Sequence, residues 1–99
     1  MKAELIFRQR VDLREGTFKE IVIWKVPNPL SGSPHSYKYK MALIEGNICV
    51  LRYGNEAGKG DHLHIGTIEE PYTFTNIEQL LDDFEGSIRR YLDGYTNHR

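Results

Sequence analysis

The sequence predicts an α+β fold, an antiparallel β-meander of about five strands with one C-terminal amphipathic helix packed on a face. Segments of alternating or β-branched residues recur through the first two thirds of the chain, and glycine-containing turns separate them. Apolar residues at helical spacing fill the last quarter. We expect residues 1–99 to form a single α+β domain.

The first two strands are predicted from their residue content. Residues 3–11 and 18–26 are rich in apolar, β-branched and aromatic side chains, and Glu15-Gly16 marks a turn between them. Three prolines between positions 27 and 34 then indicate a loop that cannot lie inside a sheet.

A β-hairpin is predicted around Gly46-Asn47, since a glycine in first place suits a two-residue type II′ turn. In this register Lys40 pairs with Tyr53, and directly paired residues share a face of the sheet. We therefore expect Lys38, Lys40 and Tyr53 on one face and Arg52 on the other.

The last predicted strand, residues 62–66, has a period of two that places His62 and His64 on the same face. The helix follows, with Thr75 as the predicted N-cap of a capping box and Gly94 as the predicted stop. Its apolar stripe consists of Ile77, Leu80, Leu81, Phe84, Ile88 and Leu92.

Composition narrows the class of protein. Hydrophobic residues make up 39% and charged residues 27% of the chain, as in an ordinary soluble domain. No apolar run is long enough to span a membrane, and the first residues do not have the pattern of a signal peptide. The lone Cys49 rules out an internal disulfide and is typical of the reducing cytoplasm. The net charge of −1 gives no sign of bulk polyanion binding, although a local basic patch is compatible with it.

The segment Asn55–His64, NEAGKGDHLH, is the candidate functional site. It combines acids, a lysine and two histidines on a glycine-rich loop, and histidines can serve as acid and base near neutral pH. The lysine can hold an anion or a developing negative charge. The predicted catalytic residues are Glu56, Lys59, Asp61, His62 and His64.

This loop offers what a metal-independent ribonuclease needs: a base for the 2′-hydroxyl, an acid for the leaving 5′-oxygen and a cation for the phosphate. Charged and aromatic side chains nearby suit single-stranded RNA. The predicted substrate-binding residues are Lys38, Lys40, Arg52, Tyr53 and Asn55.

Structural and metal-binding interpretations compete with this one. The glycines are common in ordinary turns, Asp61 can bond its own loop, and Cys49 and Trp24 are expected in the core. The His62-x-His64 pair can chelate a metal with Asp61 or Glu56, but the chain has no CxxC and the intervening lysine would repel a cation. The predicted site therefore has no metal and no cofactor.

Residues 49–66, CVLRYGNEAGKGDHLHIG, resemble the TumE-like family of small toxin–antitoxin proteins. The segments VIWKVP at 22–27, SYKYKM at 36–41 and EEPYTF at 69–74 extend the resemblance over nearly the whole chain. The family pattern leads us to expect Asp where this chain has Gly54. The role of that acid is then absent here, or is taken by Glu56 or Asp61.

The resemblance implies a toxin of a prokaryotic toxin–antitoxin pair, encoded beside a DNA-binding antitoxin of the helix-turn-helix (HTH) type. Ribonuclease activity is inferred from the chemistry of the loop, with RNA as the target. Two alternatives stay open: a non-catalytic binding module for the antitoxin, and a metal-dependent hydrolase. The edges of an open sheet also allow a homodimer.

Overall fold

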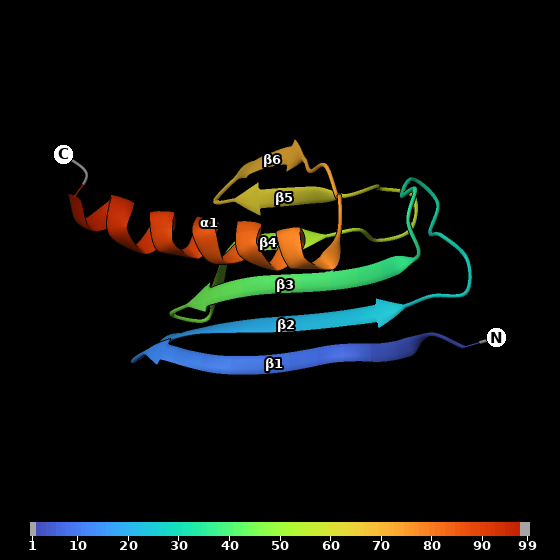
Figure 1. Cartoon of the computed structure of the whole chain (residues 1–99). Coiled ribbons are helices and arrows are strands. Elements are labelled where there is room, and N and C mark those ends of the chain that lie inside the picture. Colours follow the sequence, from blue (N-terminus) through green and yellow to red (C-terminus); the bar gives the residue numbers. More distant parts are fainter. Residues whose placement is uncertain (1, 98–99) are drawn as a thin grey trace.

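The computed structural model describes residues 2–97, with the side chains of residues 2–93. It contains six strands and one helix (Figure 1). These are β1 (Glu4–Arg14), β2 (Thr17–Lys25), β3 (Tyr37–Glu45), β4 (Ile48–Gly54), β5 (His62–Ile65), β6 (Ile68–Pro71) and α1 (Ile77–Asn97).

The strands form one sheet in the order β1-β2-β3-β4-β5-β6, and every neighbouring pair is antiparallel. The predicted α+β meander with a C-terminal helix is confirmed, with β6 as an additional short strand. The last residue of β6 is Pro71. A proline is tolerated there because β6 is an edge strand and its outer side needs no amide donor.

The register of the β3–β4 hairpin differs from the prediction. Leu43 pairs with Leu51 whereas Ile44 pairs with Cys49, so Val50 is an extra residue in β4, a β-bulge. Beyond the bulge, Lys40 pairs with Gly54 instead of Tyr53.

A one-residue shift exchanges the two faces of a strand. The predicted faces of Tyr53 and Arg52 were therefore wrong, and the two side chains are exchanged. The turn is also of a different type, because Gly46 and Asn47 both have positive φ, at 58° and 66°, as a type I′ turn requires.

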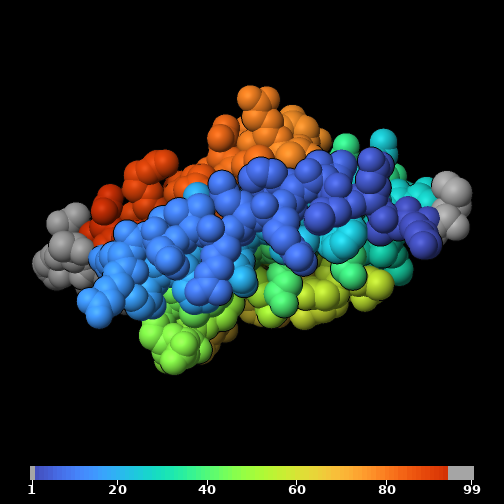
Figure 2. All heavy atoms as spheres, turned by 90° about the horizontal axis from the view of Figure 1, so that it is seen from below, coloured from blue at the N-terminus to red at the C-terminus, as the bar shows by residue number. Residues whose placement is uncertain are grey.

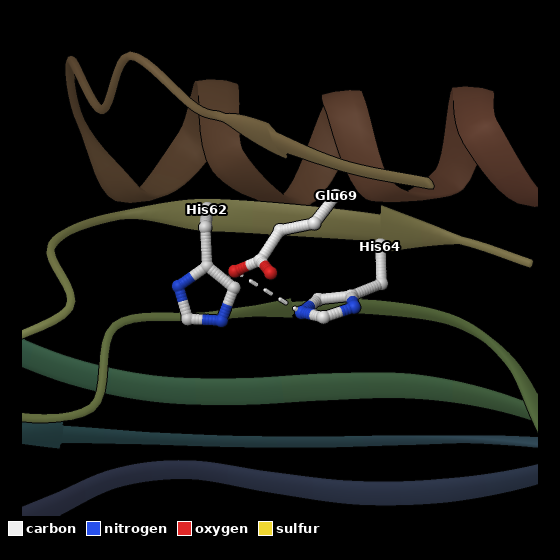
Figure 3. Close-up of side chains that lie close together, drawn as sticks. All are labelled: His62, His64 and Glu69. Atoms are coloured by element: carbon white, nitrogen blue, oxygen red, sulfur yellow. Dashed lines mark ion pairs between the residues drawn. The ribbon is translucent and has the colours of Figure 1, made fainter. Parts of the chain in front are cut away.

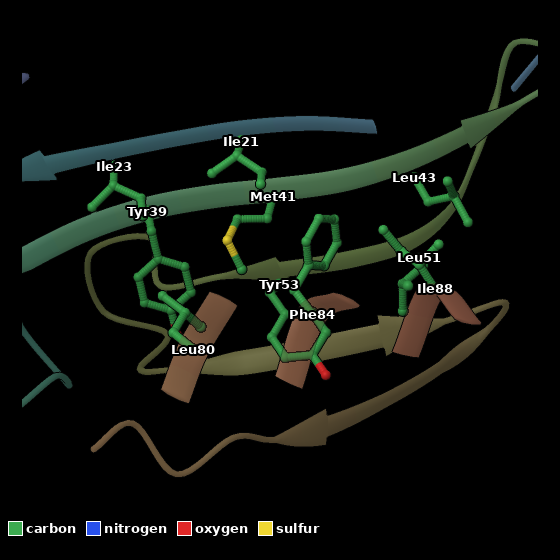
Figure 4. Packing of buried hydrophobic residues seen from close by; sticks show 10 residues of the cluster. All are labelled: Ile21, Ile23, Tyr39, Met41, Leu43, Leu51, Tyr53, Leu80, Phe84 and Ile88. Atoms are coloured by element: carbon green, nitrogen blue, oxygen red, sulfur yellow. The ribbon is translucent and has the colours of Figure 1, made fainter. Parts of the chain in front are cut away.

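Helix α1 lies across one face of the sheet and closes the core on that side. Leu80, Phe84 and Ile88 pack on the inward side chains of β2, β3 and β4 (Figure 4). The cap differs from the prediction, since the Asn76 side chain, not that of Thr75, accepts a hydrogen bond from the Gln79 amide at 2.7 Å. The backbone stays helical to Asn97, so Gly94 does not end the helix.

The opposite face of the sheet, which we call the open face, has no helix over it among residues 2–97. Viewed onto the β1 edge, α1 lies on one side, while the β3–β4 turn and the segment around residues 55–61 protrude on the other (Figure 2). Trp24 lies on the open face and is half-buried, and Cys49 is exposed. The prediction that both residues belong to the core was therefore wrong. Within the described residues, no helix is long and apolar enough to cross a membrane.

Two loops support each other at the end of the sheet that carries the candidate site. The Gly58 amide donates to the Ser31 carbonyl at 2.8 Å. A Cβ atom at Gly32 would lie 2.8 Å from the Gly60 nitrogen, and both glycines have positive φ. Only glycine fits such a close approach, so these residues fix the path of the chain into β5.

Candidate functional site

The two histidines of β5 lie side by side on the open face. His62 pairs with Gly54 and His64 with Arg52, which sets both imidazoles on the side away from α1. Their ring centres are 5.2 Å apart, and the rings meet edge to face. The predicted same-face arrangement of the histidines is confirmed.

His62 is held in one tautomer. Its Nδ1 lies 2.9 Å from the Gly60 carbonyl oxygen, and because a carbonyl can only accept, Nδ1 carries the proton. The Nε2 of neutral His62 therefore has a free lone pair. The side chain is only 4% exposed, and among the described residues this nitrogen has no hydrogen-bond partner. A buried nitrogen without a partner is costly in a purely structural role.

His64 is suited to both protonation states. Its Nε2 lies 3.4 Å from Glu69 Oε2 and 3.4 Å from Arg52 Nη2. A carboxylate only accepts and a guanidinium only donates. Protonated Nε2 can therefore donate to Glu69, and deprotonated Nε2 can accept from Arg52, so each state of His64 has a partner.

Glu56 faces the histidines from the loop. Its Oε1 is 3.3 Å from His62 Nε2. Burial alone would raise the pKa of the Glu56 carboxyl, but a hydrogen bond from its own backbone and the positive charge around it outweigh burial and lower the pKa below its ordinary value. The charges are those of Arg52 and Lys59, with that of His62 added when its imidazole is protonated. Glu56 is therefore ionised at neutral pH.

Glu56 also occupies the space over Gly54. A Cβ atom at Gly54 would lie 3.7 Å from the Glu56 carboxylate. A side chain at position 54 would thus point toward the place where the Glu56 carboxylate lies. Of the two acids considered as substitutes for an Asp at this position, Glu56 is the one on the same face.

Asp61 points away from the histidines, into a cluster on the other side of β5. Its carboxylate accepts from Ser33 Oγ at 2.6 Å, His35 Nε2 at 2.7 Å and the Tyr39 hydroxyl at 2.7 Å. The ring of His35 stacks on Phe74 at 3.8 Å. We call Ser33, His35, Tyr39 and Asp61 the aspartate cluster. Its contacts join the 26–36 loop to the sheet.

Tyr53 and Asn55 also lie away from the open face. The Tyr53 hydroxyl bonds Ser87 Oγ at 2.6 Å under α1. Asn55 is fully buried, accepts from the Tyr39 amide at 3.0 Å and donates to the Tyr37 carbonyl at 2.7 Å. Its side chain thereby continues the pairing of β3 past the end of β4 and positions the loop.

Lys38 and Lys40 are exposed on the open face, beside a groove with a volume of about 620 Å³. Cations line it from both sides, and Val22, Trp24 and Ala42 contribute its apolar surface. The cations are Arg8, Arg10, Lys38 and Lys40, against one lining carboxylate, that of Glu20, and we call this hollow the basic groove.

Cross-strand pairing connects the groove to the histidines. Arg8 pairs with Val22, Val22 with Lys40, Lys40 with Gly54 and Gly54 with His62, so these residues form one row across the sheet. With strands about 4.8 Å apart, Lys40 and His62 are separated by roughly 10 Å.

Several of these residues were not predicted from the sequence. Glu69 was missed because β6 was not predicted, although Gly66-Thr67 between Ile65 and Ile68 is a hairpin signal that would pair His64 with Glu69. Arg8 and Arg10 have the even spacing of one strand face, but the sequence does not say that this face meets the histidines.

A family model described as Toxin TumE matches residues 2–92. No curated protein and no solved structure matches the chain.

Proposed function

The chain belongs to the TumE toxin family and has the role of a toxin, and we propose that it acts by cleaving RNA without a metal ion. The observation that carries this proposal is the pair of imidazoles on the open face, one with a free lone pair and one with a partner for each protonation state. Two such groups can serve as base and acid in one reaction.

In the proposed reaction, His62 Nε2 takes the proton of a 2′-hydroxyl. The 2′-oxygen attacks the adjacent phosphorus, and the bond to the 5′-oxygen breaks. His64, protonated and held by Glu69, gives its proton to the leaving 5′-oxygen. The products are a 2′,3′-cyclic phosphate and a 5′-hydroxyl, and Arg52 and Lys59 offset the charge that develops on the phosphate.

Glu56 is the carboxylate beside the His62 nitrogen that would accept the proton. The Glu56 side chain is 47% exposed and its carboxylate lies against His62 Nε2, so it can rotate away or carry the proton itself. Glu56→Gln separates these roles. Retained cleavage identifies His62 as the base, and lost cleavage identifies Glu56 as the base with His62 behind it.

The basic groove supports a single-stranded substrate. Its cations can pair with phosphates, and Trp24 offers a face on which a base can stack. The net charge of −1 is compatible with this, because acidic residues of α1 such as Asp82 and Glu85 lie on the helix side. We propose Arg8, Lys38 and Lys40 as phosphate contacts leading to the histidines.

The partner in this proposal is a DNA-binding antitoxin of the HTH type encoded beside the toxin. Co-expression with the product of the neighbouring gene should restore growth and yield a complex of defined stoichiometry. Failure of any neighbouring product to do so would contradict the pairing.

The direct test uses purified protein and a labelled single-stranded RNA in the presence of a chelator. We expect wild-type protein to produce 2′,3′-cyclic phosphate ends and to arrest growth when expressed. His62→Ala and His64→Ala should do neither. Equal toxicity of the wild type and both variants would instead support a binding module without catalysis.

A further inference from the structure

We propose that His62, His64 and Glu69 form a binding site for a divalent transition-metal ion of the zinc class (Figure 3). One donor atom from each residue lies within 4.8 Å of the other two. The figure shows the Glu69 carboxylate between the two imidazoles, with all three side chains on the open face. This site differs from the metal-binding alternative considered from the sequence, because Asp61 is on the other side of β5 and Glu69 comes from β6.

The tautomer and the hydrogen bonding of His62 are those expected of a metal-binding histidine. A ligating histidine usually donates its second ring N–H to a carbonyl or carboxylate, which fixes the tautomer and directs the lone pair at the ion. His62 Nδ1 donates to Gly60 O, and the buried Nε2 has no hydrogen-bond partner among the described residues. An ion at this nitrogen would satisfy it.

The distances suit a small ion. Metal–ligand bonds of about 2.0–2.1 Å in a tetrahedral arrangement place neighbouring donor atoms roughly 3.3–3.4 Å apart. His64 Nε2 and Glu69 Oε2 are 3.4 Å apart. Glu69 is 46% exposed, so its side chain can rotate to close the remaining distance to His62.

The donor set selects the class of ion. Two imidazole nitrogens and one carboxylate favour zinc, cobalt or nickel over magnesium or calcium, which prefer oxygen ligands. Three protein ligands also leave a fourth position for water or another donor.

Some of the surrounding charges oppose binding of the ion and others favour it. Arg52 and Lys59 are cations close to His64 and Glu69 and oppose an incoming ion. Glu56 is a carboxylate 3.3 Å from His62 and favours it. The site is therefore expected to be weaker than a dedicated zinc site, and removal of Arg52 should strengthen it.

Binding of the ion does not depend on the proposed ribonuclease activity, but its consequence does. The ion would occupy the lone pairs that His62 and His64 need for proton transfer. If the proposed function is correct, zinc and RNA cleavage exclude each other, and zinc is an inhibitor of the toxin.

The test is calorimetric titration of the purified full chain with Zn²⁺, together with the absorption spectrum of Co²⁺. We expect one ion per chain and a low-symmetry cobalt spectrum. Glu69→Gln removes a direct ligand and should weaken binding by at least the roughly 10- to 100-fold that loss of a residue supporting a metal ligand costs. Glu70→Gln is the matched control, because Glu70 pairs with Leu63 on the other face and should bind like the wild type. Arg52→Gln should bind several-fold more tightly.

Absence of saturable binding, or equal weakening by Glu69→Gln and Glu70→Gln, would overturn the metal site. Circular dichroism of each variant identifies loss of folding, and the exposed position of Glu69 makes Glu69→Gln the variant least subject to it. RNA cleavage is measured separately. Cleavage that requires zinc would support the site and overturn the metal-independent reaction, whereas cleavage blocked by zinc and restored by chelator supports both.

Discussion

Two clusters of similar composition lie on opposite sides of β5, and their hydrogen bonds distinguish them. In the aspartate cluster, His35 Nε2 donates to Asp61 and its Nδ1 accepts from the Tyr37 amide, so both ring nitrogens are used. On the open face, His62 has the opposite tautomer and an unused Nε2. A histidine beside an acid therefore does not by itself indicate a catalytic or binding role. A histidine nitrogen whose hydrogen-bonding capacity is left unused by the fold does indicate such a role.

The comparison predicts that open-face variants lose activity and that aspartate-cluster variants lose stability. The largest effect is expected for His64→Ala. Loss of a general acid should reduce RNA cleavage by about 10²- to 10⁴-fold. The free energy of unfolding should change by no more than about 1 kcal/mol, because the His64 side chain is partly exposed and its two polar contacts are long, at 3.4 Å each.

The matched histidine is His35, which belongs to the other cluster. His35→Ala should lower the free energy of unfolding and leave cleavage by the folded protein close to the wild-type rate. If His35→Ala removed activity at full stability, or His64→Ala left cleavage intact, the distinction between the clusters would be wrong.

Asp61→Asn should have the next largest effect. The carboxylate is 5% exposed and accepts from three donors. The asparagine amide has the same shape, but its NH₂ group replaces one of the two accepting oxygens. This NH₂ donor would then face either the Ser33 hydroxyl or the donors of His35 and Tyr39. Unsatisfied buried groups cost about 1–3 kcal/mol each, so we expect a loss of about 2–4 kcal/mol in urea unfolding. An unchanged unfolding midpoint would show that the cluster does not hold the loop.

A smaller effect is expected in the groove. The double variant Arg8→Gln/Lys38→Gln should weaken binding of a single-stranded RNA about tenfold at moderate salt. It should also reduce the salt slope by roughly 0.7 for each phosphate contact removed. The control is Arg14→Gln/Lys25→Gln, which removes the same charge outside the groove. Equal weakening by both double variants would indicate that RNA is attracted by the net charge of the protein and does not follow a defined path along the groove.

The smallest effect is expected on the free energy of unfolding at alkaline pH. Burial, followed by the hydrogen bond to Asp61, raises the pKa of the Tyr39 hydroxyl far above its ordinary value. A group with a raised pKa in the folded state stabilises the fold below its unfolded pKa, near 10 for tyrosine, and loses that contribution as pH rises. The unfolding free energy should fall above about pH 10, by at most about 1.4 kcal/mol per pH unit for this residue. Tyr39→Phe should make the decline shallower, and an identical slope would contradict the assignment.

The sequence was sufficient where one local signal decided the structure. Alternation along the strands predicted the meander, apolar spacing predicted the helix, and the period of two predicted that His62 and His64 share a face. The density of ionisable groups makes residues 55–64 the candidate site, and a functional role for them is part of the proposal.

The sequence was insufficient where the answer depended on contacts between distant segments. The direction of Asp61 is set by donors distant in the sequence, Ser33 and His35 of the 26–36 loop and Tyr39 of β3. Glu69 enters the site through a strand that ends in proline. Arg8 reaches the same face through two intervening strands, which no local pattern reveals.

The bulge at Val50 determines which side chains of β4 face the histidines and which face the core. Everything from Leu51 to Gly54 is displaced by one position, so that Arg52 meets the histidines and Tyr53 enters the core. If Val50 paired with Leu43 in a ladder without the bulge, Lys40 would lie opposite Tyr53, so Tyr53 would face the histidines and Arg52 would face the core. Deletion of Val50 would remove the extra residue and leave Leu43 opposite Leu51, so the same side chains would still face the histidines. A one-residue insertion between the turn and Arg52 has no such compensation, and we expect it to be the length change that the site tolerates least.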